Sequence, residues 1–321
     1  MARMTTTTTA RQAARDALEG VALGDAFGER WFGRFRPPAE AIEQIKARRA
    51  PEESPWHWTD DTAMALAVHR ALIDQDGINR TQLAAMFGAT FLADPARGYG
   101  YGMTRLLPVL AERPERWVTE ARELFDGQGS LGNGAAMRVA PLGAWFAEDL
   151  DEVVEQAGRS AEVTHTHPEG IAGAVAVAVA AALAARSRLL GDGPDGADLL
   201  REVAARTPDG AIRDGVLAAV ALSPGTAPWR AADLLGNGQR IRASDTVPFA
   251  LWSAAHHLDS LTDALWTTAE GLGDVDTTCA ITGGVVAART GLADVPADWL
   301  RRREALPAWV AQPTGPSSSA S

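Results

Sequence analysis

The chain has 321 residues, of which 46% are hydrophobic and 22% are charged, so it contains enough apolar material for a globular core. Its formal charge of −11 argues against binding to a nucleic-acid backbone, because such surfaces need an excess of lysine and arginine. The single cysteine, Cys279, excludes an internal disulfide framework and a cysteine-built zinc site, which fits a cytoplasmic protein.

Alanine and leucine recur at helical spacing along most of the chain. We therefore expect an all-α protein, folded as one domain over residues 10–312, with disordered tails at 1–9 and 313–321. The apolar stretch 171–185 is shorter than the roughly 20 apolar residues of a membrane span, so we interpret it as a buried core helix and expect no membrane contact. In chain order, helices are predicted at residues 10–23, 63–73, 81–92, 102–109, 135–146, 150–163, 169–190, 198–205, 208–221, 246–256, 260–271 and 277–290.

Polar segments rich in glycine, aspartate or threonine interrupt these helices. Loops of this kind, held by a rigid scaffold, often carry binding or catalytic residues. The segments are residues 24–29, 59–62, 97–102, 130–134, 164–169 and 273–278.

Two of these segments place aspartates directly before an apolar helix: Asp60 and Asp61 in one, and Asp274 and Asp276 in the other. The simplest interpretation is helix capping, which satisfies free N–H groups and complements the helix dipole. Capping needs only one side chain, however, and each segment offers several. Because Mg²⁺ and Mn²⁺ prefer carboxylate and hydroxyl oxygens, the two segments also fit a shared metal site.

The glycines of segments 97–102 and 130–134 have two interpretations. They permit tight turns, or they expose backbone N–H groups that hold a diphosphate at a helix N-terminus. His165 is either a satisfied polar residue at a helix cap or a hydrogen-bond partner of a ligand hydroxyl. Trp56 and Trp58 closely precede the first aspartates, and we expect them to help wall the site.

In this order, the segments resemble those of the ADP-ribosylglycohydrolase family. The similarity extends from about residue 20 to 291, and its most specific motifs are Trp-Thr-Asp-Asp-Thr at 58–62, Gly-Asn-Gly-Ala-Ala-Met-Arg at 132–138 and Gly-Asp-Val-Asp-Thr at 273–277. The resemblance implies a compact all-α domain with two Mg²⁺ or Mn²⁺ ions. It assigns the metal ligands to Thr59, Asp60, Asp61, Asp274, Asp276 and Thr277.

The resemblance also implies a ligand and a reaction. The ligand is ADP-ribose, and the reaction hydrolyses the glycosidic bond at C1″ that joins it to a protein or small-molecule acceptor, with Asp61 and Asp276 as catalytic carboxylates. His165 matches a histidine that contacts the adenosine-side ribose. The segments that hold the diphosphate and ribose correspond to Gly100, Tyr101, Gly102, Ser130, Gly132, Asn133 and Gly134.

One position departs from the family pattern. Many members carry a glutamate where this chain has Phe32, so we expect Glu29 to take over proton transfer or gating. The alternative is that Glu29 is a solvated loop residue or pairs with Arg30 or Arg34. Two other functions stay open. A two-metal site also suits the hydrolysis of a phosphoester or phosphoanhydride, and a chain without the usual glutamate also fits a non-catalytic ADP-ribose binder.

Overall fold

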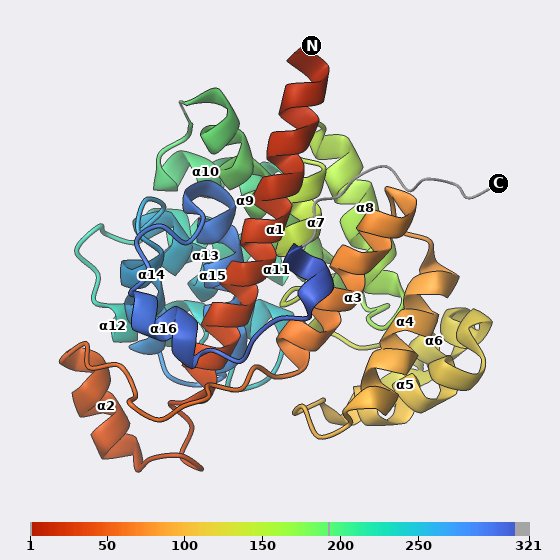
Figure 1. The fold of residues 1–321 in the computed structure, drawn as a ribbon, viewed down its shortest axis with the longest axis horizontal. Helices are drawn as coiled ribbons and strands as arrows, with labels where there is room; N and C mark the ends of the chain where they lie inside the picture. Colours follow the sequence, from red (N-terminus) through yellow and green to blue (C-terminus); the bar gives the residue numbers. More distant parts are fainter. Residues whose placement is uncertain (1, 192, 312–321) are drawn as a thin grey trace.

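The computed structural model describes residues 2–191 and 193–311, and within those ranges it is built from helices joined by turns and loops (Figure 1). Two isolated β-bridges, Trp56 to Arg303 and Gly132 to Arg242, tie loops together. The all-α prediction is therefore confirmed. The α-helices are α1 (Ala2–Glu29), α2 (Pro38–Lys46), α3 (Asp60–Gln75), α4 (Arg80–Ala93), α5 (Tyr101–Glu112), α6 (Trp117–Gly127), α7 (Ala140–Trp145), α8 (Leu150–Glu162), α9 (Pro168–Leu190), α10 (Gly196–Arg206), α11 (Ala211–Ala221), α12 (Pro228–Leu235), α13 (Ala243–His256), α14 (Leu261–Ala269), α15 (Val275–Thr290) and α16 (Ala297–Arg302).

The antiparallel helices α1 and α15 form the centre of the fold and lie unusually close together (Figure 1). A Cβ atom added to Gly24 would lie 2.0 Å from the carbonyl oxygen of Cys279. One added to Gly28 would lie 2.4 Å from that of Val275, and Gly20 repeats the same four-residue spacing. Only glycine permits this approach. Gly20, Gly24 and Gly28, which we call the glycine ridge, therefore bring the end of α1 against the start of α15.

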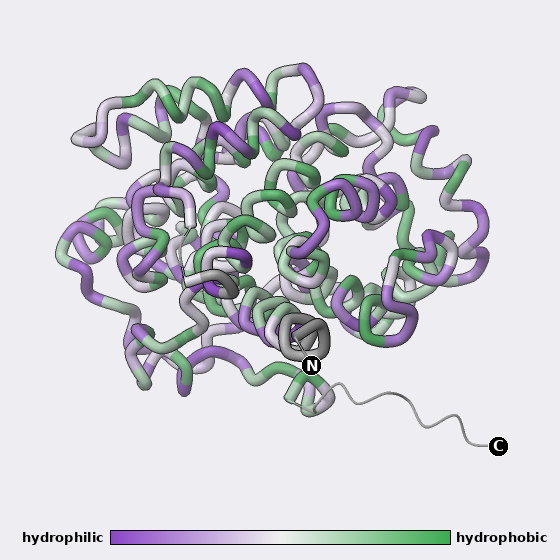
Figure 2. The backbone as a smooth tube through the Cα atoms, turned by 90° about the horizontal axis from the view of Figure 1, so that it is seen from above, coloured by the Kyte–Doolittle hydropathy of each residue, from purple (hydrophilic) through white to green (hydrophobic). Residues whose placement is uncertain are grey.

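Other helices surround this pair. In Figure 1, α3 to α6 lie on one side of α1 and α12 to α14 on the other, while α7 and α9 pack against both central helices. Hydrophobic backbone segments gather towards the interior in Figure 2, and hydrophilic ones follow the outer turns. By length and composition, the stretch Pro168–Arg188 of α9 is apolar enough to cross a membrane. Of its apolar window, 83% is buried inside the protein, as expected of a core helix.

The helix α1 differs from the prediction at both ends. It includes residues 2–9, which we expected to be a disordered tail, and residues 24–29, which we expected to be a loop. Threonine is only modestly worse than alanine in a helix, so a helix that has already formed continues through it. At the other end, close packing on α15 keeps residues 24–29 helical, although their glycines locally favour a break in the helix. The predicted C-terminal tail, 313–321, lies outside the described residues.

Proline explains several of the other differences. The predicted helix 135–146 is replaced by a short 3₁₀ helix, Asn133–Ala135, and by α7, which has Pro141 in its first turn. The helices α2, α6, α12 and α16 were not predicted. Two of them begin with a proline, α2 with Pro38 and α12 with Pro228. Proline is favoured in the first turn because the N–H that it lacks has no partner there. A proline that seems to mark a break therefore marks a helix start.

Candidate metal and ligand site

Asp25, near the end of α1, caps the N-terminus of α3. Its carboxylate accepts hydrogen bonds from the backbone N–H groups of Thr59, at 2.9 and 3.0 Å, and of Thr62, at 3.1 Å. The hydroxyl groups of the same threonines donate to it at 3.0 and 2.5 Å. A carboxylate from another helix thus does what a local cap usually does, and it fixes the start of α3 against α1.

Three carboxylates from three helices converge at this point. One oxygen each from Asp25, Asp61 and Asp276 lies within 4.8 Å of the others. Oδ2 of Asp61 lies 3.1 Å from the Thr59 hydroxyl and 3.5 Å from the Thr277 hydroxyl. Oδ1 of Asp61 is buried and has no hydrogen-bond partner among the described residues.

Asp60 and Asp274 extend this cluster. Both line the cavity that Asp61 and Asp276 also line. The backbone N–H of Asp60 donates to the carbonyl of Arg97 at 2.8 Å, which fixes the loop before α3. The structure therefore brings together the two acidic segments that the sequence places at opposite ends of the chain.

Burial and mutual repulsion raise the pKa of these carboxyl groups. Burial raises the pKa of Asp25 to about 6, and burial together with the charge of Asp25 raises the pKa of Asp60 to about 8. Burial, followed by the charges of neighbouring aspartates, raises the pKa of Asp61 and Asp276 well above the usual range. No ion pair with a basic side chain among the described residues offsets this effect.

These residues fit divalent cations. None of the described arginines forms an ion pair with these aspartates. Arg34 pairs with Glu29 and Arg97 with Glu304, and the buried Arg138, which also lines the cavity, donates to Thr164 and to the Ser160 carbonyl. A hard cation would supply the missing positive charge and a partner for the free oxygen of Asp61. The donor set consists of carboxylate and hydroxyl oxygens, which Mg²⁺ and Mn²⁺ prefer.

A cavity of about 490 Å³ opens from the cluster. Part of its lining is acidic, and another part consists of two glycine-rich segments. One segment leads into α5, whose first backbone N–H groups have no partner within the helix. In it, Gly98 has a φ of +93°, which favours glycine, and it lies beside Asp60, with 3.5 Å between an added Cβ and Oδ1. The second segment contributes Ser130, Gly132, Asn133 and Gly134 to the lining.

Asn133 joins the two parts of the cavity. Its Nδ2 donates to Oδ2 of Asp274 at 2.6 Å and lies 3.1 Å from the Thr246 hydroxyl. The preceding residue, Gly132, forms a β-bridge with Arg242. The glycine segment is thus fixed to the acidic cluster on one side and to the loop before α13 on the other.

The predicted metal and ligand residues line this cavity, with Thr59 as the exception. Thr59 lies behind the lining, where its hydroxyl contacts Asp25 and Asp61. Glu29, the predicted proton-transfer residue, is also absent from the lining. It lies at the end of α1, with both carboxylate oxygens paired to Arg34, the alternative that the sequence left open.

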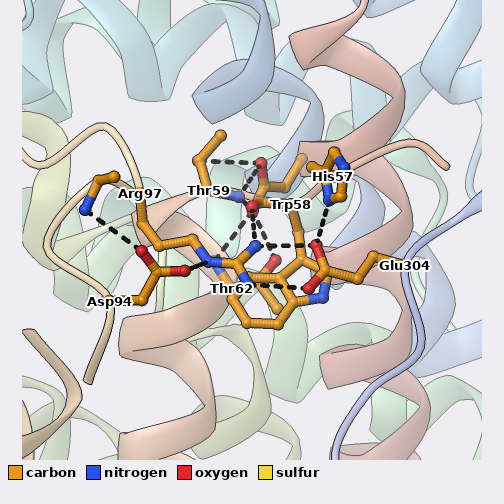
Figure 3. A network of polar contacts seen from close by, with 9 residues as sticks. His57, Trp58, Thr59, Thr62, Asp94, Arg97 and Glu304 are labelled. Carbon is orange, nitrogen blue, oxygen red and sulfur yellow. Dashed lines mark hydrogen bonds and ion pairs between the residues drawn. The ribbon is translucent and has the colours of Figure 1, made fainter.

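The prediction that Trp56 and Trp58 wall the site is wrong. Trp56 is fully buried in the core, and Trp58 packs under Arg97, whose guanidinium carbon lies 3.6 Å from the ring centroid. Figure 3 shows Arg97 between Asp94 and Glu304, and Arg97 also donates to the Trp58 carbonyl at 2.8 Å. These side chains support the loop before α3 from behind instead of facing the cavity.

Sequence reasoning missed several residues of the site. Asp25 stands in a segment that we singled out, but only the fold shows that it meets Asp61. The buried Arg138 ends the motif at 132–138, but the sequence predicted no role for its side chain. Phe125 and Ile241 are exposed, line the cavity and have left-handed φ values of 54° and 56°, for which the local sequence gives no signal.

The fold and the site define a class: an all-α protein whose clustered aspartates suit hard cations beside a glycine-lined cavity. Residues 6–314 match the family model of the ADP-ribosylglycohydrolases. The chain therefore belongs to the ADP-ribosylglycohydrolase family, as the sequence motifs predicted.

Relatives of known sequence agree with this assignment, and a solved structure shares the fold. The chain is 32% identical to the ADP-ribosylhydrolase ARH3 of Homo sapiens over 172 residues, which cover 50% of this chain and 47% of that one. It thus spans about half the length of the ARH3 relatives it matches. It is 30% identical to an uncharacterized protein of Archaeoglobus fulgidus, with 89% and 90% of the two chains covered. A solved ADP-ribosylglycohydrolase-related protein complex shares the fold, with a TM-score of 0.62, 23% identity and coverage of 92% and 93%.

Proposed function

We propose that this protein is a metal-dependent hydrolase that cleaves the glycosidic bond between ADP-ribose and a protein or small-molecule acceptor. One observation carries the proposal: buried aspartates that form no ion pair with a described basic side chain border a cavity that is also lined by two glycine-rich segments. The first feature suits divalent cations, and the second suits a diphosphate. ADP-ribose has both a diphosphate and a ribose whose hydroxyls can face the acidic side chains.

The glycine-rich segments would hold the diphosphate. Gly100, Tyr101 and Gly102 present the N-terminus of α5, where free N–H groups and the helix dipole favour an anion. Gly132 and Gly134 lie beside His165 without side chains that would cover it. A substrate fixed at its diphosphate presents its distal ribose in one orientation, which lowers the entropic cost of reaction.

Two Mg²⁺ or Mn²⁺ ions would be held by Asp60, Asp61, Asp274, Asp276 and Thr277, with Asp25 completing the cluster. When bound, such ions lower the pKa of a coordinated water and orient hydroxyl oxygens. Thr59 would act through its hydrogen bonds to Asp25 and Asp61.

The reaction breaks the bond between C1″ and the acceptor, and water supplies the new hydroxyl at C1″ and the proton on the leaving acceptor. We propose Glu29 for the proton transfer even though its carboxylate pairs with Arg34 and does not line the cavity, because it lies close to the cluster. Burial raises the pKa of Asp60 and Asp276 most, and the charge of Glu29 adds to the effect on both. Arg34 holds the Glu29 carboxylate in place.

A panel of defined ADP-ribosylated acceptors, assayed with Mg²⁺, with Mn²⁺ and with a chelator, tests this proposal. We expect release of ADP-ribose that requires metal and is lost in Asp61→Asn and Asp276→Asn. The matched control is Asp259→Asn, an exposed aspartate paired with Arg289. Formation of AMP and ribose phosphate would instead indicate a phosphoanhydride hydrolase, and ADP-ribose binding without turnover of any acceptor would indicate a binder.

A further inference from the structure

Two buried polar residues, Arg138 and Thr164, are linked by hydrogen bonds to His165, outside the metal cluster. Nη2 of Arg138 donates to the hydroxyl oxygen of Thr164 at 2.9 Å. The same hydroxyl lies 2.7 Å from Nδ1 of His165. Arg138 and Thr164 are fully buried and His165 is nearly so, so bulk water does not compete for the hydrogen bonds that join them.

The direction of each hydrogen bond follows from the donors that are present. A guanidinium can only donate, so the Thr164 oxygen accepts from Arg138. The hydroxyl hydrogen of Thr164 then needs an acceptor, and Nδ1 of His165 is the acceptor within reach. A buried hydroxyl hydrogen without a partner would cost free energy. Nδ1 therefore accepts, and the proton of the neutral imidazole sits on Nε2.

The cationic form of His165 is disfavoured by its surroundings. Burial, and after it the positive charge of Arg138, lowers the pKa of His165 to about 3. Across the working pH range of most proteins the ring is therefore neutral, with one donor and one acceptor nitrogen. Arg138 and Thr164 decide which nitrogen is the donor.

The donor nitrogen faces the glycine segment of the cavity. A Cβ added to Gly132 would lie 3.4 Å from Nε2 of His165, and one added to Gly134 would lie 3.2 Å from it. His165 itself lines the cavity. The absence of side chains at these two positions leaves the N–H group accessible to a ligand.

We propose that Arg138 and Thr164 are positioning residues that hold His165 in its Nε2–H tautomer, so that the ring donates a hydrogen bond to an acceptor oxygen of the ligand. The site thereby selects ligands that carry a hydroxyl or phosphate oxygen at this point and rejects analogues that present only donors. That the ligand is ADP-ribose rests on the proposed function, whereas the tautomer does not.

Arg138 is suited to this role because its other contacts fix its position. Nη2 also donates to the carbonyl of Ser160 at 3.0 Å, and the guanidinium carbon lies 4.3 Å from the ring centroid of Phe87. The guanidinium cannot move away from Thr164 without losing both contacts. The hydrogen-bonded series Arg138, Thr164 and His165, which we call the relay, is therefore held rigidly at the end that lies away from the ligand.

Nitrogen-15 NMR of the imidazole tests the tautomer directly. In the wild-type protein we expect the long-range proton–nitrogen correlations of the Nε2–H form. Thr164→Val removes the donor to Nδ1 while keeping the shape, and we expect a shift towards the Nδ1–H form. Thr164→Ser restores the hydroxyl and should restore the wild-type spectrum. A wild-type Nδ1–H tautomer, or an unchanged tautomer in Thr164→Val, would overturn the inference.

Calorimetry with ADP-ribose tests the consequence for binding. We expect Thr164→Val to weaken affinity roughly tenfold, equivalent to about 1.4 kcal/mol, and Thr164→Ser to bind like the wild type. His165→Gln carries its own amide donor, so adding Thr164→Val to it should change affinity little. An equal loss in both backgrounds would indicate a structural effect of Thr164 and contradict the relay. If the wild type does not bind ADP-ribose, the proposed function fails, while NMR still decides the tautomer.

Discussion

The carboxyl group of Asp60 combines burial with repulsion, and this gives its protonation a measurable effect on stability. In the metal-free protein its pKa is about 8, compared with about 3.9 for an unperturbed aspartate. The unfolded chain therefore loses this proton at lower pH than the folded one. The stabilising contribution of the proton is present at acidic pH and is lost as the pH rises through about 8.

We predict that the free energy of unfolding of the metal-free protein falls by roughly 1 kcal/mol between pH 7 and pH 9 because of Asp60 alone. Asp60→Asn lacks this proton, so its stability should depend less on pH in the same window. Urea unfolding of both proteins in a chelator, at the two pH values, gives the difference. Parallel pH dependences would contradict the raised pKa of Asp60.

The ion pair between Glu29 and Arg34 fits both a functional and a structural role of Glu29. If Glu29 transfers a proton, Glu29→Gln should lower kcat by roughly 10²–10⁴-fold with little effect on ADP-ribose affinity. Arg34→Met keeps the carboxylate and removes only the ion pair, so it should lose much less. Equal losses in the two variants would assign Glu29 to the ion pair alone.

The contact between α1 and α15 is the element on which the site depends. Asp25 lies one residue after Gly24, where the two helices touch, and Asp276 lies in the first turn of α15. Any change that separates these helices also separates the carboxylates. The glycine ridge therefore links packing to metal binding.

We predict that Gly24→Ala destabilises the protein by roughly 1–3 kcal/mol or more, because the added Cβ would lie 2.0 Å from a backbone carbonyl of α15. The metal-induced rise in Tm should shrink in the same variant. Gly158→Ala, in the interior of α8, is the matched control. Its Cβ would meet only Ile171, at 4.0 Å, and the change should stabilise the helix by about 0.5–1 kcal/mol. Wild-type stability of Gly24→Ala would show that the helices are not so closely packed in solution.

On the scale of the whole molecule, the candidate ligands tie three helices together. Asp25 belongs to α1, Asp61 to α3 and Asp276 to α15, so a bound cation links segments that are far apart in the sequence. A ligand that binds only the folded state stabilises it in proportion to the logarithm of its concentration. Metal binding should accordingly stabilise the entire domain and not one loop.

We predict that Mg²⁺ or Mn²⁺ at about 100 times its Kd raises the free energy of unfolding by about 2.7 kcal/mol for each ion bound. Far-ultraviolet circular dichroism and tryptophan fluorescence should report one coincident transition with and without metal. The double variant Asp61→Asn, Asp276→Asn should show no such gain. A gain that persists in this variant would place the cation elsewhere.

The sequence determined by itself what depends on local physical chemistry. Helical periodicity predicted the all-α fold and the approximate bounds of helices such as α4 and α8. The aspartates at the starts of α3 and α15 were visible because acidic and hydroxyl side chains gather where a helix begins. The ordered motifs indicated the family because they lie within short stretches of chain.

Tertiary structure decided what depends on contacts between distant residues. Asp25 meets Thr59 and Thr62 across more than 30 residues of chain, so no local pattern identifies it as the cap of α3. The same holds for the relay from Arg138 to His165, which joins residues 27 positions apart through Thr164. Local conformational preference determines which segments are helical. The free energy of packing determines which side chains come into contact, and the candidate site is made of such contacts between distant residues.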